Sequence, residues 1–301
     1  MAAASIAQRG GIATPGSGRA LPVAVVTLAI LLVWYLGAIW LNAPQVIDRY
    51  GDQPWTWQQL AADSWSMDRP VLPAPHQVMA ELNKTVFQTA VTSKRSLVYH
   101  GWITLSATLL GFVLGTLLGI LLAVGIVHVR TLETSLMPWV ITSQTIPILA
   151  IAPMVVVVMG SVGLTGLLPK ALISMYLCFF PITIGMVKGL RSPDVLATEL
   201  MHTWNATQTQ VFWKLRWPAA VPYLFASLKV AIAISLVGAI VGEMPTGAQA
   251  GIGARLLSGS YYGQTVQIWA ALVMGSVLAG ALIALINLAE RLTLRAMGAQ
   301  T

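Results

Sequence analysis

The residues best placed to recognise a partner lie in a polar segment, residues 199 to 222, between two long apolar stretches. Glu199 is followed six positions later by Asn205, a residue suited to a turn, and then by Phe212 and Lys214. Charged side chains form charge-assisted hydrogen bonds, and an aromatic ring offers apolar contact area. This spacing predicts a docking loop for another protein rather than a reactive centre.

Residue types that perform covalent chemistry are not grouped in this chain. His, Cys, Asp and Glu do not occur at metal-ligand spacing, no pairing of a nucleophile with a base stands out, and the phosphate loop Gly-x-x-x-x-Gly-Lys-Ser/Thr is absent. Cys178 is the only cysteine, so no disulfide can form within the chain. We therefore expect no catalytic residue, no metal and no cofactor bound by this chain.

The composition indicates a membrane protein. Of the 301 residues, 56% are hydrophobic and only 9% are charged, against about 25% charged in ordinary soluble domains. Several uncharged stretches exceed the roughly 20 residues with which a helix crosses about 30 Å of hydrocarbon. The sequence predicts an all-α, polytopic helical bundle with six membrane spans, at about 21–41, 101–127, 136–160, 167–187, 222–242 and 267–289.

These spans set the expected organisation and topology. Residues 1–19 are predicted to be a disordered tail, and residues 20–298 a single transmembrane domain. The distribution of Lys and Arg weakly favours both termini in the cytoplasm, which places residues 42–98 outside and residues 188–221, with the docking loop, inside. The net charge of +7 reflects this topology rather than nucleic acid binding.

The first half of the docking loop is predicted to be a short helix. Ser192, Pro193 and Asp194 supply a capping oxygen, a residue preset for the first turn, and an acid at the positive end of the helix dipole. The helix should end near Asn205, because asparagine adopts a positive φ more readily than most residues.

A second short helix should follow the turn. Thr207 and Gln210 match a capping box that opens it, and Pro218 should end it. Large apolar side chains on the two helices have no lipid to enter, so we expect them to contact a protein partner or the base of the bundle: Leu196, Leu200, Trp204 and Phe212.

The third span contains polar and helix-breaking residues. Ser143, Gln144 and Thr145 are followed by Pro147 and Pro153, so the backbone should be interrupted within the membrane and its freed carbonyls satisfied by neighbours or water. Such a span is a candidate lining of a transport pathway. A kink absorbed by packing alone is the alternative.

Glu243 is a second candidate for the pathway or its gate. An acid directly after an uncharged run is costly unless it faces water, a partner or a cavity. An ordinary interfacial carboxylate is the other interpretation. His100 and His128, near the ends of spans, are also expected to be interfacial.

Two further patterns concern packing and the external segment. Gly111, Gly115 and Gly119 repeat every four residues in the second span, which favours close approach of another helix of this chain over a contact between two copies. Residues 42–98 should be partly ordered, with a surface helix over 76–92. Its tryptophans, Trp55, Trp57 and Trp65, would anchor at the membrane interface or contact a ligand or a delivery protein.

The docking loop resembles the EAA loop of binding-protein-dependent permeases of the ATP-binding cassette (ABC) type. The matching positions are Glu199, Ala206, Phe212, Lys214, Pro218, Ala219, Ala220 and Pro222. Asn205 stands where the family usually has Gly, and Leu200 and Met201 replace the usual alanine pair. The resemblance covers about residues 70–290, including Leu72-Pro73-Ala74-Pro75 and Gly251-Ile252-Gly253. It points to the nitrate, sulfonate and taurine branch, which also contains carriers of thiamine-precursor pyrimidines.

This resemblance implies a type I importer permease in a bacterial cytoplasmic membrane. It would pass a small solute, either a nitrate-, sulfonate- or taurine-like anion or a nitrogen heterocycle, delivered by an extracytoplasmic binding protein. ATP and Mg would bind to separate ATPase subunits, and a second permease subunit would complete the pathway. Glu199 would support the loop by charge-assisted hydrogen bonds and Asn205 would set its turn. The implied coupling residues are Glu199, Leu200, Trp204, Asn205, Ala206, Phe212, Lys214 and Pro218.

Two other classes fit less well. A secondary transporter or channel working without an ATPase is the main alternative, and a coupled transporter would need intramembrane acids in corresponding halves of an inverted repeat. A membrane-embedded enzyme would need clustered polar catalytic groups. Neither feature is evident in the sequence.

Overall fold

The computed structural model describes residues 17–245 and 250–298, which are mostly helical and contain no strand. Most of the predicted tail, residues 1–16, lies outside the described residues, whereas residues 17–19 already belong to the first helix. The chain divides into two compact units, Met1–Ala80 and Glu81–Thr301. The single domain predicted for residues 20–298 stays a prediction.

The first unit is a long helix with a short helix folded back against it. α1 covers Ser17–Tyr50, α2 covers Trp57–Ser66, and α3, Pro75–Asn83, begins in this unit. With 34 residues α1 is about 51 Å long, which exceeds the hydrocarbon thickness of about 30 Å. Most of its side chains between residues 21 and 41 are exposed, as a lipid-facing span requires.

A buried asparagine fixes the connection between α2 and α3 in this unit. The amide nitrogen of Asn42 donates to the carbonyls of Ser64 and Leu72, at 3.0 and 2.9 Å. Its amide oxygen accepts from the backbone N–H groups of Val71 and Leu72, at 2.7 and 3.2 Å. All four hydrogen-bonding positions of the side chain are used. The segment after α1 is therefore ordered, as predicted.

The expected surface helix is present, and the tryptophans differ in their surroundings. α3 continues into a π-helical turn, η1, Lys84–Gln88, which together span most of the predicted range of 76–92. Trp65 turns inward and donates from Nε1 to the carbonyl of Tyr35 at 3.2 Å. Trp57 is 77% exposed and lies edge-on to Trp55.

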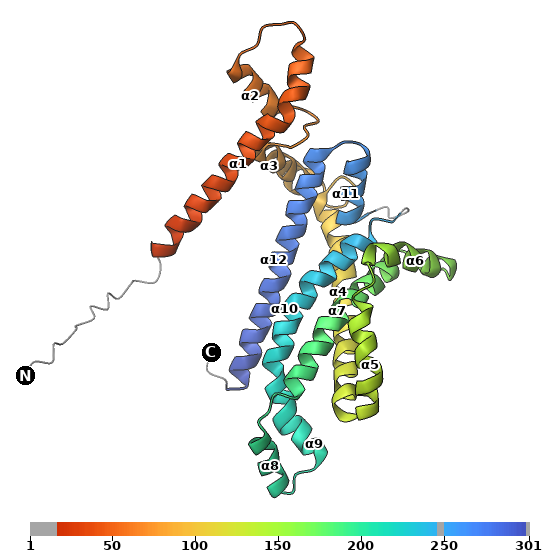
Figure 1. Ribbon diagram of the computed structural model, residues 1–301. Helices are drawn as coiled ribbons and strands as arrows, with labels where there is room; N and C mark the ends of the chain where they lie inside the picture. Colours follow the sequence, from red (N-terminus) through yellow and green to blue (C-terminus); the bar gives the residue numbers. More distant parts are fainter. Residues whose placement is uncertain (1–16, 246–249, 299–301) are drawn as a thin grey trace, which may run out of the picture. The chain divides into compact units, whose positions relative to one another are not determined.

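The second unit is a bundle built around α7. α7 covers Leu167–Leu190 and packs against α4, Leu97–His128, and against α10, Trp217–Gly242. α12, Thr265–Ala296, packs along α10, and Figure 1 shows these helices running side by side. Buried apolar side chains of α4, α7 and α10 form its core, among them Ile126, Ile182, Met186, Leu190 and Ile232.

The repeated glycines of α4 face α7 of the same chain. A Cβ atom added to Gly115 would lie 2.2 Å from the sulfur of Cys178, and one added to Gly111 would lie 2.4 Å from Cβ of Ser174. Only glycine permits this helix separation. The prediction of close packing within the chain is confirmed.

Five helical segments of the described residues are long and apolar enough to cross a membrane: Leu21–Tyr50, Leu97–His128, Leu167–Leu190, Gln208–Gly242 and Thr265–Ala296. The sixth predicted span, 136–160, corresponds to two helices, α5, Arg130–Ser143, and α6, Ile148–Ser161, bent by 100°. Counted as one span, this pair gives the predicted six. The predicted interruption of its backbone is also present.

Candidate functional site

The docking loop begins with α8, Val195–Thr203, whose cap differs from the predicted one. Asp194 is the N-cap, and its carboxylate accepts from the backbone N–H of Leu196 at 3.4 Å. Ser192 was the predicted cap, and that assignment is wrong. Its backbone N–H and its hydroxyl both donate to the carbonyl of Gly189, at 3.1 and 2.8 Å, so Ser192 completes the last turn of α7. Pro193 separates the two helices.

The turn after α8 is a Schellman motif centred on Asn205. Asn205 has a φ of 53°, the only positive φ at a described residue other than glycine. Its N–H donates to the carbonyl of His202 at 2.9 Å, and the N–H of Ala206 donates to the carbonyl of Met201 at 3.0 Å. These two bonds satisfy carbonyls that the helix end would leave unpaired. The predicted turn and the role of Asn205 in it are confirmed.

The second helix opens with the predicted capping box. The hydroxyl of Thr207 accepts from the N–H of Gln210 at 3.3 Å, and the side chain of Gln210 accepts from the N–H of Thr207 at 2.9 Å. α9, Gln208–Val211, then passes into a π-helical segment, η2, Phe212–Arg216, and directly into α10.

Pro218 does not end this helix, so that prediction is wrong. The N–H of Trp217 bonds to the carbonyl of Phe212, five residues back, and Pro218 lies in the first turn of α10. A proline at that place needs no N–H donor, and its fixed φ suits the helix. The docking loop is therefore joined to a membrane-spanning helix without a break.

The apolar side chains of the docking loop divide into two groups. Leu196 and Leu200 on α8 and Trp204 at its C-cap follow one another at four-residue spacing and are 71%, 51% and 72% exposed. Phe212 instead packs against the bundle core, and its ring centroid lies 5.3 Å from that of His128 at the end of α4. α8 thus presents an uncovered apolar stripe, while Phe212 connects the loop to the bundle.

Glu199 and Lys214 are exposed charged residues of the loop. Glu199 is exposed, and its carboxylate forms no hydrogen bond or ion pair with the described residues. It was predicted to support the loop by such bonds, and within this chain that is wrong, because the Schellman motif and the capping box already satisfy the turn. Lys214 is likewise exposed.

The candidate pathway residues lie at the break between α5 and α6. Ser143 ends α5, and its carbonyl accepts a hydrogen bond from the hydroxyl of Tyr176 on α7. Thr145 donates to the carbonyl of Thr142 at 2.8 Å, and Gln144 is half-buried. A neighbouring side chain therefore satisfies a freed carbonyl, as expected. Pro153 lies inside α6 without ending it, so Pro147 alone marks the break.

Glu243 is fully buried at the other end of α10, where it holds the segment before α11, Ile252–Tyr261. Its carboxylate accepts from the hydroxyl of Thr104 at 2.9 Å and from the N–H of Gly253 at 2.9 Å. Lys170 lies 3.7 Å away and donates to the carbonyl of Ala250 at 2.9 Å. None of these bonds reaches the break at residues 143–147, so Glu243 and the polar break are separate features.

His100 completes this arrangement, which we call the clasp: His100, Thr104, Lys170, Glu243 and residues 250–253. Nδ1 of His100 accepts from the N–H of Gly251 at 3.0 Å, so Nε2 carries the proton and donates to the carbonyl of Lys94 at 2.9 Å. His100 is buried within the protein, in the first turn of α4, and its position at the membrane interface stays a prediction. Burial raises the pKa of Glu243 to about 7.

Sequence reasoning missed two members of the clasp, Lys170 and Thr104. A signal was available: a lysine, a histidine and a glutamate each stand at the end of an apolar stretch, where charge is expensive unless it is paired.

Comparison with known protein families shows what kind of protein this is. The family of binding-protein-dependent transport system inner membrane components matches residues 115–298, which include α7, the docking loop, α10 and Glu243. This chain belongs to that family. It is a permease subunit of an ABC importer, a transport subunit rather than an enzyme, in the nitrate and sulfonate branch.

The permease is similar to several named relatives. A probable ABC transporter permease protein of Haemophilus influenzae is 30% identical over 216 residues, or 72% of this chain and 83% of the relative. The formylaminopyrimidine transport permease protein ThiX of Halalkalibacterium halodurans is 33% identical over 183 residues, 61% of this chain and 68% of ThiX. The riboflavin transport system permease protein RibX of Chloroflexus aurantiacus is 32% identical over 196 residues, 65% of this chain and 71% of RibX.

Proposed function

We propose that α8 is the part of the permease that docks into an ABC ATPase. The observation that carries the proposal is the exposed stripe of Leu196, Leu200 and Trp204 beside the unpaired carboxylate of Glu199. An exposed tryptophan among apolar neighbours, with a charge at the rim, has the composition of an interface centre. ATP and Mg belong to the partner, and this chain supplies the surface.

Movement of α8 would reach the membrane through two connections. The first is continuous helix, because α9, η2 and α10 follow without a break from residue 208 to residue 242. The second is the contact of Phe212 with His128 at the end of α4. A closing ATPase would therefore displace α10 and α4 together, rather than bend a loose loop.

The cargo we favour is a nitrogen heterocycle. ThiX and RibX, at 33% and 32% identity, are named for formylaminopyrimidine and riboflavin, whereas similar permeases named for aliphatic sulfonates and nitrate are 24% and 25% identical. An extracytoplasmic binding protein would deliver it. Binding of heterocycles and of oxyanions to that protein, measured by calorimetry, decides between the two classes, and selective binding of oxyanions would reject this assignment.

Both termini would lie in the cytoplasm, with a second permease subunit completing the pathway. Cysteine labelling tests the orientation in a background where Cys178 is replaced. A cysteine at Gln53 should react with an impermeant reagent added to intact cells, and one at Gln208 should not. The reverse pattern would place the docking loop on the wrong side for an ATPase.

The docking proposal is tested by separating binding from coupling. Trp204→Ala should weaken ATPase binding by about thirtyfold, the effect of about 2 kcal/mol expected for a central tryptophan. Glu199→Ala should weaken it less. Phe212→Ala should leave binding nearly intact but lower ATP-driven uptake in proteoliposomes severalfold, because Phe212 faces the bundle and not the partner.

Trp57→Ala is the matched control, since Trp57 is 77% exposed but lies outside the docking loop. It should bind the ATPase as the parent does. Equal ATPase affinity of the Trp204→Ala and Trp57→Ala variants would show that the stripe on α8 is not the docking surface.

A further inference from the structure

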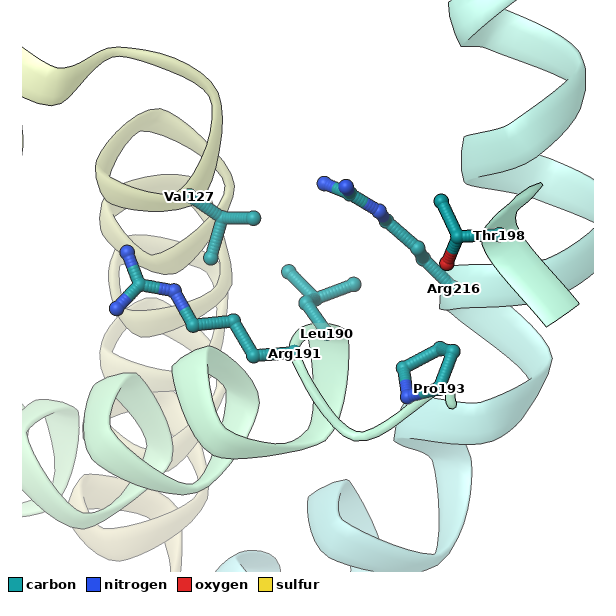
Figure 2. Close-up of a pocket in the computed structure, with 6 residues that line it drawn as sticks. All are labelled: Val127, Leu190, Arg191, Pro193, Thr198 and Arg216. Carbon is teal, nitrogen blue, oxygen red and sulfur yellow. The ribbon is translucent and has the colours of Figure 1, made fainter. Parts of the chain in front are cut away.

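A cavity of about 210 Å³ lies where the docking loop meets the bundle. Its walls come from α4, the end of α7, α8 and η2, and the lining residues are Val127, Leu190, Arg191, Pro193, Thr198 and Arg216. It is more than ten times larger than the roughly 15 Å³ that one water molecule needs. Figure 2 shows Arg216 reaching from one wall toward Val127, with Arg191 on the opposite wall.

The two arginines of this cavity differ in their charge balance. Arg191 is paired with Glu133 of α5 through two parallel contacts of 2.8 Å, Nη1 to Oε1 and Nη2 to Oε2. Arg216 is half-buried and has no ion pair with the described residues. The cavity therefore carries one uncompensated positive charge, on a group whose planar fork fits phosphate or carboxylate oxygens.

The position of the cavity along the spans limits what can supply that anion. Val127 and Leu190 stand at the last turns of α4 and α7. α7 has 24 residues and is about 36 Å long, so its ends extend beyond about 30 Å of hydrocarbon into the headgroup layer. Exposed Trp213, three residues before Arg216, is also typical of that layer. Lipid phosphates lie at this depth.

We propose that this cavity binds a phosphate group, supplied by an anionic phospholipid, through paired hydrogen bonds from Arg216. A lipid whose phosphodiester is its only charge, with no headgroup cation to balance it, matches the single unpaired guanidinium. Basic pockets at the ends of membrane helices bind lipid headgroups in this way. A bound headgroup would touch α8 through Thr198 and the bundle through Val127 and Leu190, and so would hold the docking loop at a fixed angle. The orientation proposed above decides only which leaflet supplies the lipid.

The test uses the purified full-length permease without an ATPase, so that its outcome is independent of the docking proposal. Native mass spectrometry measures retention of phosphatidylglycerol and of phosphatidylcholine by the parent and three variants. Phosphatidylglycerol should be retained preferentially. Arg216→Gln should lower its retention about tenfold, and Arg216→Lys should lower it less, because the charge stays while the paired geometry is lost.

Lys188→Gln is the matched control, because Lys188 is an exposed cation on the last turn of α7 that does not line the cavity. It should retain phosphatidylglycerol as the parent does. Equal losses in the Lys188→Gln and Arg216→Gln variants would overturn the proposal, since retention would then follow total charge. Unchanged retention of phosphatidylglycerol in Arg216→Gln would also overturn it, since Arg216 would then not hold the headgroup.

Inorganic phosphate distinguishes the two sources of a phosphate group. Millimolar phosphate should not displace phosphatidylglycerol from the parent, because the acyl chains anchor the lipid beside the cavity. Displacement by phosphate, together with phosphate binding to the delipidated parent but not to Arg216→Gln, would confirm the phosphate site and identify the free ion as its ligand.

Discussion

Replacing Thr104 by valine should release the segment before α11 from the bundle. The hydroxyl of Thr104 donates to the buried carboxylate of Glu243 and accepts from the backbone N–H of Ile252 at 2.9 Å. Valine keeps the shape of threonine but offers neither function. Above about pH 7, where Glu243 is ionised, loss of a hydrogen bond to this charged group costs about 1.5–3 kcal/mol, and an orphaned buried N–H costs about 1–3 kcal/mol. The clasp should therefore weaken by about 2.5–6 kcal/mol.

Hydrogen exchange at the amide of Ile252 measures this effect locally. A loss of 2.5 kcal/mol corresponds to roughly sixtyfold faster exchange, since about 1.4 kcal/mol is a factor of ten. Thr104→Ser keeps the hydroxyl and should change exchange only severalfold.

Thr116→Val is the second control for this experiment. Thr116 is on the same helix, and its buried hydroxyl has no hydrogen-bond partner among the described residues. The same substitution there should be neutral or slightly stabilising. Similar exchange rates at Ile252 in the Thr104→Val and Thr104→Ser variants would refute the assignment of the hydroxyl to the clasp.

Three further substitutions test the turn, the helix packing and the buried carboxylate. Asn205→Gly should transport normally, whereas Asn205→Val should lose activity, because a β-branched residue at a φ of 53° is strained by about 1–3 kcal/mol; equal uptake by both would reject the turn. Gly115→Ala should lower the thermal midpoint, since overpacking costs about 1–3 kcal/mol, while Gly280→Ala, with open space around its Cβ, should not; equal midpoints would contradict the packing. Because the pKa of Glu243 is raised on folding, the folded state binds a proton more tightly than the unfolded state does. The resulting contribution to the free energy of unfolding is complete below about pH 4.5 and is lost as the pH rises through about 7. The parent's thermal midpoint should therefore fall between pH 5 and pH 8 more than that of Glu243→Gln, and parallel profiles would argue against a buried proton at this site.

The sequence alone determined the features that depend on neighbouring residues. The capping box of Thr207 and Gln210 and the turn at Asn205 arise from bonds between residues three to five positions apart. The break at Pro147 follows from one missing N–H group. Membrane spans follow from hydropathy over about 20 residues, because the lipid, and not a distant part of the chain, is the solvent of those helices.

Tertiary structure decided between local signals of similar strength. Ser192 and Asp194 are both residue types that cap helices well. In the folded chain Ser192 bonds to the last turn of α7, and Asp194 caps the start of α8. Pro218 is a helix breaker in isolation. A π-helical segment placed it in the first turn of α10, where proline is tolerated, so the docking loop became continuous with a membrane helix.

Tertiary structure alone also determined the buried polar sites. Thr104 and Glu243 are 139 residues apart, and hydropathy shows only that each lies in or next to an apolar stretch. Which buried polar groups meet depends on how α4, α7 and α10 are rotated about their axes. Close glycine contacts between α4 and α7, and between α7 and α10, restrict that rotation. A charge buried at a helix end must find a partner, but only the packed helices determine whether that partner is Thr104, Lys170 or the backbone of Gly253.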